Sequence, residues 1–203
     1  MSKISLEPNA SGAGTFTLAA PNSNTNRTLN LPDESGTIFS DGTGVPGSAV
    51  TGQLASSNMP AGSVIQVVQN SFDTQTEITS TSYVSTGLSA SITPISSSNK
   101  ILIFVDLLGD LRFDAEDRSQ YGDLDLRRNG TSITERSVRK RSSGTVTNVA
   151  PMNFGTIDFD APNTTSLVTY ETFCRTRFTT NNGAFFFNHA AGESTITLME
   201  IAG

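Results

Sequence analysis

Apolar residues along this chain recur in short runs that alternate with polar residues, as they do in half-buried β-strands. The runs are rich in β-branched and aromatic residues and are broken by Gly, Asn, Asp and Pro, which favour turns. Runs of helix-forming residues at helical spacing are hard to find. The pattern therefore predicts an all-β protein of about eight to ten strands, a number typical of an antiparallel β-sandwich of the jelly-roll type.

The first part of the chain, residues 1–62, is poor in large apolar residues and rich in Pro and Gly. Residues 15–18 and 28–31 alternate cleanly, and each stretch predicts a short strand with one apolar face. Ordering a residue costs on the order of 1–2 kcal/mol, so a segment with so few apolar groups cannot fold alone. We expect it to intertwine with neighbouring chains. The residues expected in that core or subunit interface are Phe16, Leu18, Leu29 and Leu31.

The second part, residues 63–203, has enough apolar residues for a β-sandwich of its own. Residues 100–108 form the strongest predicted strand, and they are apolar on both faces. In an antiparallel sheet one such face packs in the core and the other needs a cover, most economically a partner subunit. Phe104 in this strand and Phe186 in the run 184–187 are the candidates here for core or trimer interface.

Two Asn-Gly pairs predict hairpin turns. Asn129-Gly130 is expected to join strands near 121–127 and 132–138. Asn182-Gly183 is expected to fold the alternating run 167–178 back onto residues 184–187.

Acidic residues crowd between positions 106 and 125, and carboxylates at such density can bind calcium. The candidate metal ligands are Asp114, Glu116 and Asp117. A basic cluster follows at once, from Arg127 to Arg141, and the hairpin at Asn129-Gly130 would fold it back onto the acidic residues. Charge pairing within or between chains is favoured over a metal site.

Asp106 interrupts the apolar strand 100–108. A buried carboxylate without a partner costs several kcal/mol, so this side chain is expected at an interface or in an ion pair. Arg112 and Arg175 are the candidate partners.

Few residues suggest catalysis. His189 is the only histidine and stands in a predicted loop, where histidine is more often a surface residue than a base. Cys174 lies on the apolar face of its predicted strand, and a single cysteine excludes an intrachain disulfide. Residues 185–187 with Tyr121 are candidates for an aromatic surface that binds sugars, but three consecutive aromatic residues more often form core and subunit interface. We expect no enzymatic activity and no cofactor.

Charge and hydropathy exclude two classes of partner. The net charge is -6 and the pI about 4.7, which argues against a duplex nucleic-acid binder. No apolar run of about 18 residues is present, so insertion in a membrane is not expected. The start of the chain lacks the pattern of a signal peptide, and we expect a protein kept in a reducing compartment.

Three stretches resemble virion structural and fibre proteins of tailed bacteriophages, particularly marine phages. They are TFTLAAPNSNTNRTLNLPD at 15–33, ITPISSSNKILI at 92–103 and STITLMEI at 194–201. The resemblance is least clear over residues 105–165. It implies a homotrimer whose N-terminal part anchors to the particle and whose C-terminal jelly roll forms a knob like the tumour-necrosis-factor and C1q heads. No catalytic residues carry over from this group.

Three functions fit this reading. The first is a trimeric short tail fibre or spike that attaches to a glycan or protein of the host surface. The second is a capsid decoration or head-fibre protein that cements the shell. In both, residues 1–62 contact other virion proteins, and the protein is made in the host cytoplasm and found in the virion. The third is an unrelated carbohydrate-binding or carbohydrate-degrading β-protein.

Overall fold

The structure, a computed structural model, describes most of the second part of the chain and little of the first. The described residues are 11–15, 17, 22–26, 28, 58–113, 119–141, 148–179, 183–188 and 192–203. The chain divides into two compact units, residues 1–49 and 50–203. Phe16, Leu18, Leu29 and Leu31 lie outside the described residues, so their role stays a prediction.

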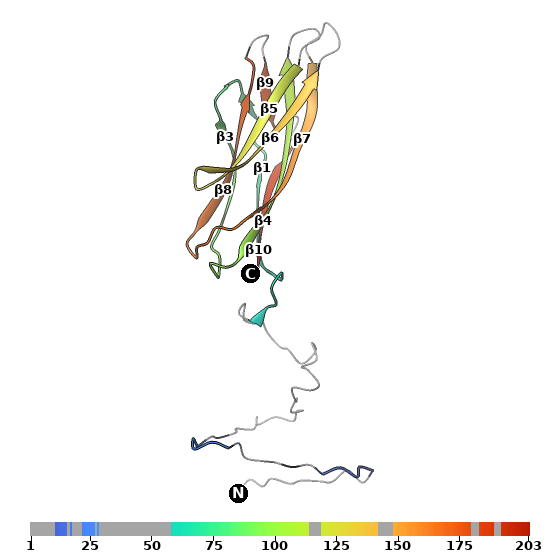
Figure 1. The fold of residues 1–203 in the computed structure, drawn as a ribbon. Coiled ribbons are helices and arrows are strands. Elements are labelled where there is room, and N and C mark those ends of the chain that lie inside the picture. Colours follow the sequence, from blue (N-terminus) through green and yellow to red (C-terminus); the bar gives the residue numbers. More distant parts are fainter. Residues whose placement is uncertain are drawn as a thin grey trace. The chain divides into compact units, whose positions relative to one another are not determined.

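The second unit is built from strands, and the described residues contain no α-helix (Figure 1). Their bounds are β1 Val64–Phe72, β2 Thr76–Ile78, β3 Val84–Ile92, β4 Lys100–Phe113, β5 Ser119–Arg128, β6 Thr131–Arg141, β7 Asn148–Asp160, β8 Val168–Thr176, β9 Ala184–Phe187 and β10 Ser194–Ile201. The sequence places most of these strands closely. Residues 148–160 form one long strand, β7.

Two antiparallel sheets make up the sandwich (Figure 1). One has the order β1-β10-β4, with β7 on the other edge of β4 and the short pair β9-β2 beside its second half. The other has the order β3-β8-β5-β6. The main pairs β1–β10, β3–β8, β4–β7 and β5–β6 are nested, as in one long hairpin rolled onto itself. This is the jelly-roll arrangement that the strand pattern predicts.

The tip of the nested hairpin is the predicted turn at Asn129-Gly130. Its φ angles are 48° and 83°, the left-handed conformation that a type I′ hairpin turn requires and that Asn and Gly adopt at least cost. The prediction for this turn is confirmed.

The second predicted hairpin is wrong. Strand β8 lies between β3 and β5 in one sheet, and β9 pairs with β4 and β2 in the other. Both edges of β8 are therefore occupied, and the chain crosses to the opposite sheet instead of folding back.

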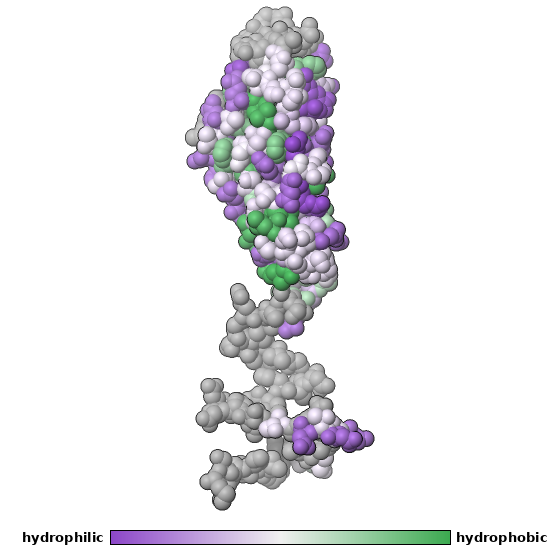
Figure 2. Space-filling view, turned by 90° about the vertical axis from the view of Figure 1, so that its left-hand side faces the viewer, coloured by the Kyte–Doolittle hydropathy of each residue, from purple (hydrophilic) through white to green (hydrophobic). Residues whose placement is uncertain are grey.

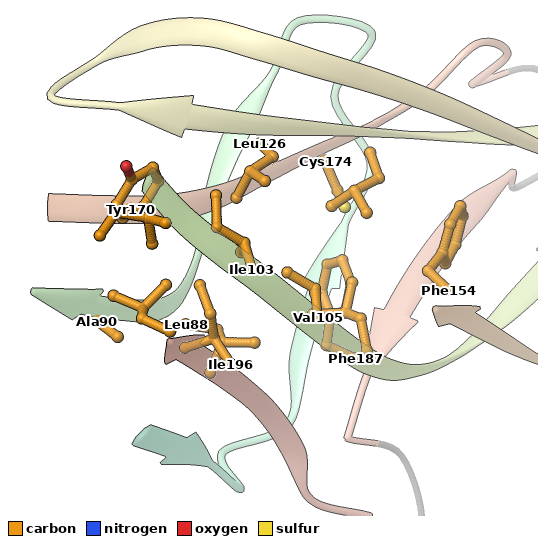
Figure 3. Close-up of a cluster of buried hydrophobic side chains, with 14 of the residues drawn as sticks. Leu88, Ala90, Ile103, Val105, Leu126, Phe154, Tyr170, Cys174, Phe187 and Ile196 are labelled. Carbon is orange, nitrogen blue, oxygen red and sulfur yellow. The ribbon is translucent and has the colours of Figure 1, made fainter. Parts of the chain in front are cut away.

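The core lies between the two sheets (Figure 3). Ile103 and Val105 of β4 meet Leu126 of β5 and Tyr170 of β8, all buried. The Tyr170 hydroxyl donates to Asp160 at 2.7 Å, so its polar atom is satisfied at the rim of the core. Cys174 is buried among these side chains, as the alternation of its strand predicts.

A buried and hydrogen-bonded carboxylate lies at one end of the sandwich. Glu200 is 0% exposed and accepts three hydrogen bonds, from Gln66 Nε2 at 2.5 Å, Ile95 N at 2.7 Å and Asn99 Nδ2 at 2.6 Å. At this same end Gly62 N donates to Ala202 O at 2.8 Å. The segment that leads into β1 and the last residues after β10 therefore lie side by side.

We expect the Glu200→Ala variant to lose about 3 kcal/mol of unfolding free energy, because it removes the shared acceptor of three buried or partly buried donors. Urea unfolding followed by circular dichroism measures the loss. Glu193→Ala, at an exposed position just before β10, is the matched control and should change stability by no more than about 0.5 kcal/mol. Equal effects of the two substitutions would contradict the role of Glu200.

Candidate functional site

The outer side of the first sheet carries a band of apolar side chains that the domain itself does not cover. Residues paired across the strands share a face, and the register aligns Val67, Met199, Leu102 and Phe159 in one row. Phe104 and Ile157 are adjacent in the next row. The outer apolar face is defined here as Val67, Leu102, Phe104, Ile157, Phe159 and Met199.

Three of these side chains are largely exposed: Ile157 at 64%, Val67 at 54% and Phe159 at 51%. The other three are partly exposed. Burying one side chain of this size is worth about 1.5–3 kcal/mol, and contiguous exposed apolar surface on a soluble domain usually marks an interaction site. The face is therefore the strongest candidate for contact with another chain.

Strand β4 produces this face by alternation. Ile101, Ile103 and Val105 point into the core, whereas Leu102 and Phe104 point outward. The expectation that one face of this strand needs a cover agrees with the exposure of its neighbours. The structure shows no partner chain, so the role of Phe104 in a trimer stays a prediction.

Asp106 continues the outward side of β4, next to Thr195 and Gly155 on the neighbouring strands. Its side chain is exposed. The proposed pairing with Arg112 or Arg175 is wrong, because Arg112 bonds to Glu77 at 2.6 Å and Arg175 to Asp123 at 2.9 Å. An exposed carboxylate keeps its water, so it needs no ion pair.

A depression of about 370 Å³ follows beyond Asp106 on the same side of the sheet. It lies where the edge of β4 passes from β10 to β9. Its lining residues are Leu108, Gly109, Asp110, Pro151, Met152, Asn153 and Gly192.

The outer side of the second sheet is different, because its centre is a network of charges. Asp123 is 1% exposed and accepts hydrogen bonds from Arg175 Nε at 2.9 Å, Arg177 Nε at 2.9 Å and Ser137 Oγ at 2.6 Å. Asp125 is equally buried and accepts from Arg127 Nε at 2.6 Å and Ser132 Oγ at 2.6 Å.

Aromatic rings support the same three guanidinium groups. Arg127 lies 4.1 Å from the centre of the Phe173 ring, and Arg175 4.5 Å from that of Tyr83. Arg177 lies 4.9 Å from the ring centre of Tyr121. Arg127, Arg175 and Arg177 are called the arginine row below.

The side of the domain where β3 and β8 are labelled in Figure 1 faces the viewer in Figure 2. On this side hydrophobic side chains form separate patches among hydrophilic ones.

The pKa values of one hydroxyl group and one carboxyl group here shift in opposite directions. Desolvation raises the pKa of Tyr83 to about 12. Burial alone would also raise the pKa of Asp123, but hydrogen bonds from Arg177, Ser137 and Arg175 outweigh it, so the pKa lies below its ordinary value.

Charge pairing of the acidic stretch is thus found, but with different partners than expected. In the described part of the chain, Arg127 of the cluster Arg127 to Arg141 bonds to Asp125, whereas Asp123 bonds to Arg175 of β8 and to Arg177 directly after it. Arg128 bonds instead to Asp160 at 2.8 Å. The alternation of residues 167–178 puts Arg175 and Arg177 on the polar face, but they reach Asp123 only because β8 and the residue after it lie beside β5.

The candidate metal ligands Asp114, Glu116 and Asp117 lie outside the described residues, as does His189. Within the described parts of the chain no three His, Cys, Asp or Glu side chains are placed to hold a metal ion. No helix in those parts has the length and hydropathy to cross a membrane.

The aromatic surface for sugars, which was the less favoured interpretation of residues 185–187 with Tyr121, is not formed. Phe185 and Phe187 are buried core residues. Phe186 points outward from the first sheet, 4.7 Å from Arg112, whereas Tyr121 lies on the outer side of the second. Alternation along β9 separates Phe186 from its neighbours, and the sandwich separates it from Tyr121.

Comparisons with known proteins assign no family. No family of known proteins and no curated protein matches the chain. Among solved structures, the VP2 subviral particle of infectious bursal disease virus is similar at a TM-score of 0.37 and 14% identity, over 70% of this chain and 34% of VP2. Dimeric latent PorU from Porphyromonas gingivalis is similar at 0.34 and 9%, over 74% of this chain and 14% of PorU. This chain therefore spans about a third of VP2 and a smaller part of PorU, and likenesses this weak carry no argument about function.

We expect Asp123→Asn to lower the unfolding free energy at neutral pH by about 2 kcal/mol, since hydrogen bonds to a charged group are weakened. The folded-state pKa of Asp123 is below the unfolded value. Its contribution is therefore present above the unfolded pKa and lost as the pH falls through the folded pKa. The difference in unfolding free energy between wild type and variant, measured by urea unfolding, should therefore become smaller towards acid pH. Asp73→Asn, at an exposed position, is the control, and its unfolding free energy should stay close to that of the wild type at every pH. A difference in unfolding free energy between wild type and Asp123→Asn that is independent of pH would contradict this account.

Proposed function

We propose that this chain is a structural protein of a bacteriophage virion, a homotrimeric short tail fibre or spike that attaches the particle to its host. The outer apolar face carries the proposal. The resemblance of residues 15–33, 92–103 and 194–201 to phage fibre proteins supports it from the sequence.

A second copy of the chain is the simplest cover for the outer apolar face. The face runs across β1, β10 and β4 to β7, whose other edge is unpaired among the described strands. A neighbour that packs its edge against this face makes a heterologous contact, and such contacts form a ring when the rotation between copies closes. A three-membered ring agrees with the trimer that the resemblance implies.

The ends of the sandwich support an attachment role. The chain enters β1 and leaves β10 at one end, where Gly62 and Ala202 are hydrogen bonded. The paired strand ends Phe113 with Asn148, and Ser119 with Arg141, lie at the other end. An anchor through residues 1–62 would use the first end and leave the other to face a partner.

A non-enzymatic role is part of the proposal. The thiol of Cys174 is buried, and burial raises its pKa well above the ordinary value, which disfavours the nucleophilic thiolate. Incubation of the protein with host-surface polysaccharides tests this point: no shortening of the chains is expected, and turnover would contradict it.

Assembly is tested by a charge placed in the outer apolar face. We expect the full-length chain to be a trimer in light scattering coupled to size exclusion, and Ile157→Glu to be a monomer, because three carboxylates would lose their water in the interface. Leu167→Glu is the matched control, since Leu167 is 62% exposed and Ile157 64%, and Leu167 lies outside the face.

The control variant should remain a trimer. A wild-type monomer, or a trimer that survives Ile157→Glu, would contradict the proposed interface. The place of the protein is tested by cryo-electron microscopy of the virion: density at the tail is expected, and density over the capsid faces would favour the decoration protein instead.

A further inference from the structure

The arginine row has a geometry that serves more than the stability of the sheet. In each of the three side chains Nε donates to a buried carboxylate and the guanidinium lies over an aromatic ring. Arg177 also donates from Nη2 to Ser137 Oγ at 2.8 Å. Both kinds of contact hold the guanidinium planes in place, which lowers the entropy lost when they bind something else.

The carboxylates of this network are hidden and the guanidinium groups are accessible. The side chains of Asp123 and Asp125 are 2% and 1% exposed, whereas those of Arg177, Arg175 and Arg127 are 41%, 34% and 25% exposed. A molecule that approaches this side of the sheet therefore meets the cations before the anions.

The charge of this side also differs from that of the whole chain. By the register of β5, β6 and β8, the arginines at 127, 139, 141 and 175 point outward. Arg177, directly after β8, bonds to Asp123 on the same side, which makes five. Four acidic residues share the face, at 123, 125, 135 and 171. The balance is one positive charge on the face of a chain whose net charge is -6.

Apolar ring surface lies next to the row. Tyr121 packs edge-on against Phe178 with ring centres 6.0 Å apart, and Phe178 is 48% exposed. Tyr121 is also the ring under Arg177. A ligand that carries anionic groups on an apolar-faced ring would find both kinds of contact within one patch.

We propose that the arginine row, with Tyr121 and Phe178, binds an anionic polysaccharide through its carboxylate or sulfate groups. A guanidinium group binds such planar or multidentate oxyanions through paired N–H donors. Once Nε is used, the donors left are those of the terminal nitrogens, apart from the one that Arg177 Nη2 gives to Ser137. Sugar rings stack their C–H faces on the aromatic rings. The proposal rests on the proposed attachment function and names the chemistry of the ligand.

The experiment measures binding of the full-length chain to immobilised dextran sulfate, polygalacturonate, unmodified dextran and polyglutamate by biolayer interferometry in 0.15 M salt. We expect one or both anionic polysaccharides to bind, with an affinity that falls as salt rises. Dextran and polyglutamate should not bind. The preferred polysaccharide then separates sulfate from carboxylate recognition.

Variants locate the site. Arg177→Lys keeps the positive charge beside Asp123 but loses the paired donors, so a merely structural role predicts unchanged binding, whereas the proposal predicts a loss of about ten-fold. Phe178→Ser tests the ring contact without touching an ion pair. Arg136→Gln is the matched control, because Arg136 is an exposed arginine of β6 on the opposite side of the strand from the row.

The outcomes separate this inference from the proposed function. Any of three results would overturn the polysaccharide site and leave the proposed trimer intact. The trimer binds no anionic polysaccharide, it binds polyglutamate equally well, or its Arg177→Lys and Phe178→Ser variants bind like wild type. A monomer in light scattering contradicts the proposed assembly, whatever it binds.

Discussion

Strand β4 is apolar on both of its faces, and the rest of the structure depends on this. It pairs with β10 and β9 along one edge and with β7 along the other, so it is the central strand of its sheet. The second sheet covers Ile101, Ile103 and Val105 but cannot reach the other side of the same strand. The domain is therefore complete as a sandwich, and the proposed cover for its outer apolar face is another copy of the chain.

The two outer sides of the sandwich favour different kinds of contact. The first sheet presents the outer apolar face, which favours contact with another copy of the chain. The second presents guanidinium groups held by buried carboxylates and by aromatic rings, which favours an anionic ligand. If the first side is used in assembly, the second faces away from the contact and stays accessible. One jelly roll can thus combine assembly with recognition.

Much of the fold follows from the sequence because its signals are local. Alternation gives the strands, and Asn129-Gly130 gives the turn at the tip of the nested hairpin. The same Asn-Gly signal fails at residues 182–183, because both edges of β8 are already paired, and pairing is a property of the whole chain. Tertiary pairing also decides that β7 is one strand and that Glu200 closes one end of the sandwich.

The candidate sites follow from the sequence only in part, for the same reason. The two-sided strand points to Phe104, but Val67, Met199 and Phe159 join it only through the register of four strands. Likewise the charges of Asp123 and Arg175 are visible in the sequence, whereas their contact depends on β5 lying beside β8.

The central claim is that the outer apolar face is covered in the assembled protein, and hydroxyl-radical footprinting of the full-length chain tests it most directly. Phe159 and Phe178 are 51% and 48% exposed in the single chain, and Ile157 and Leu167 are 64% and 62% exposed. Within each pair only the first residue belongs to the outer apolar face. The account predicts that Phe159 and Ile157 are protected from oxidation while Phe178 and Leu167 are modified. Equal oxidation within both pairs would contradict it.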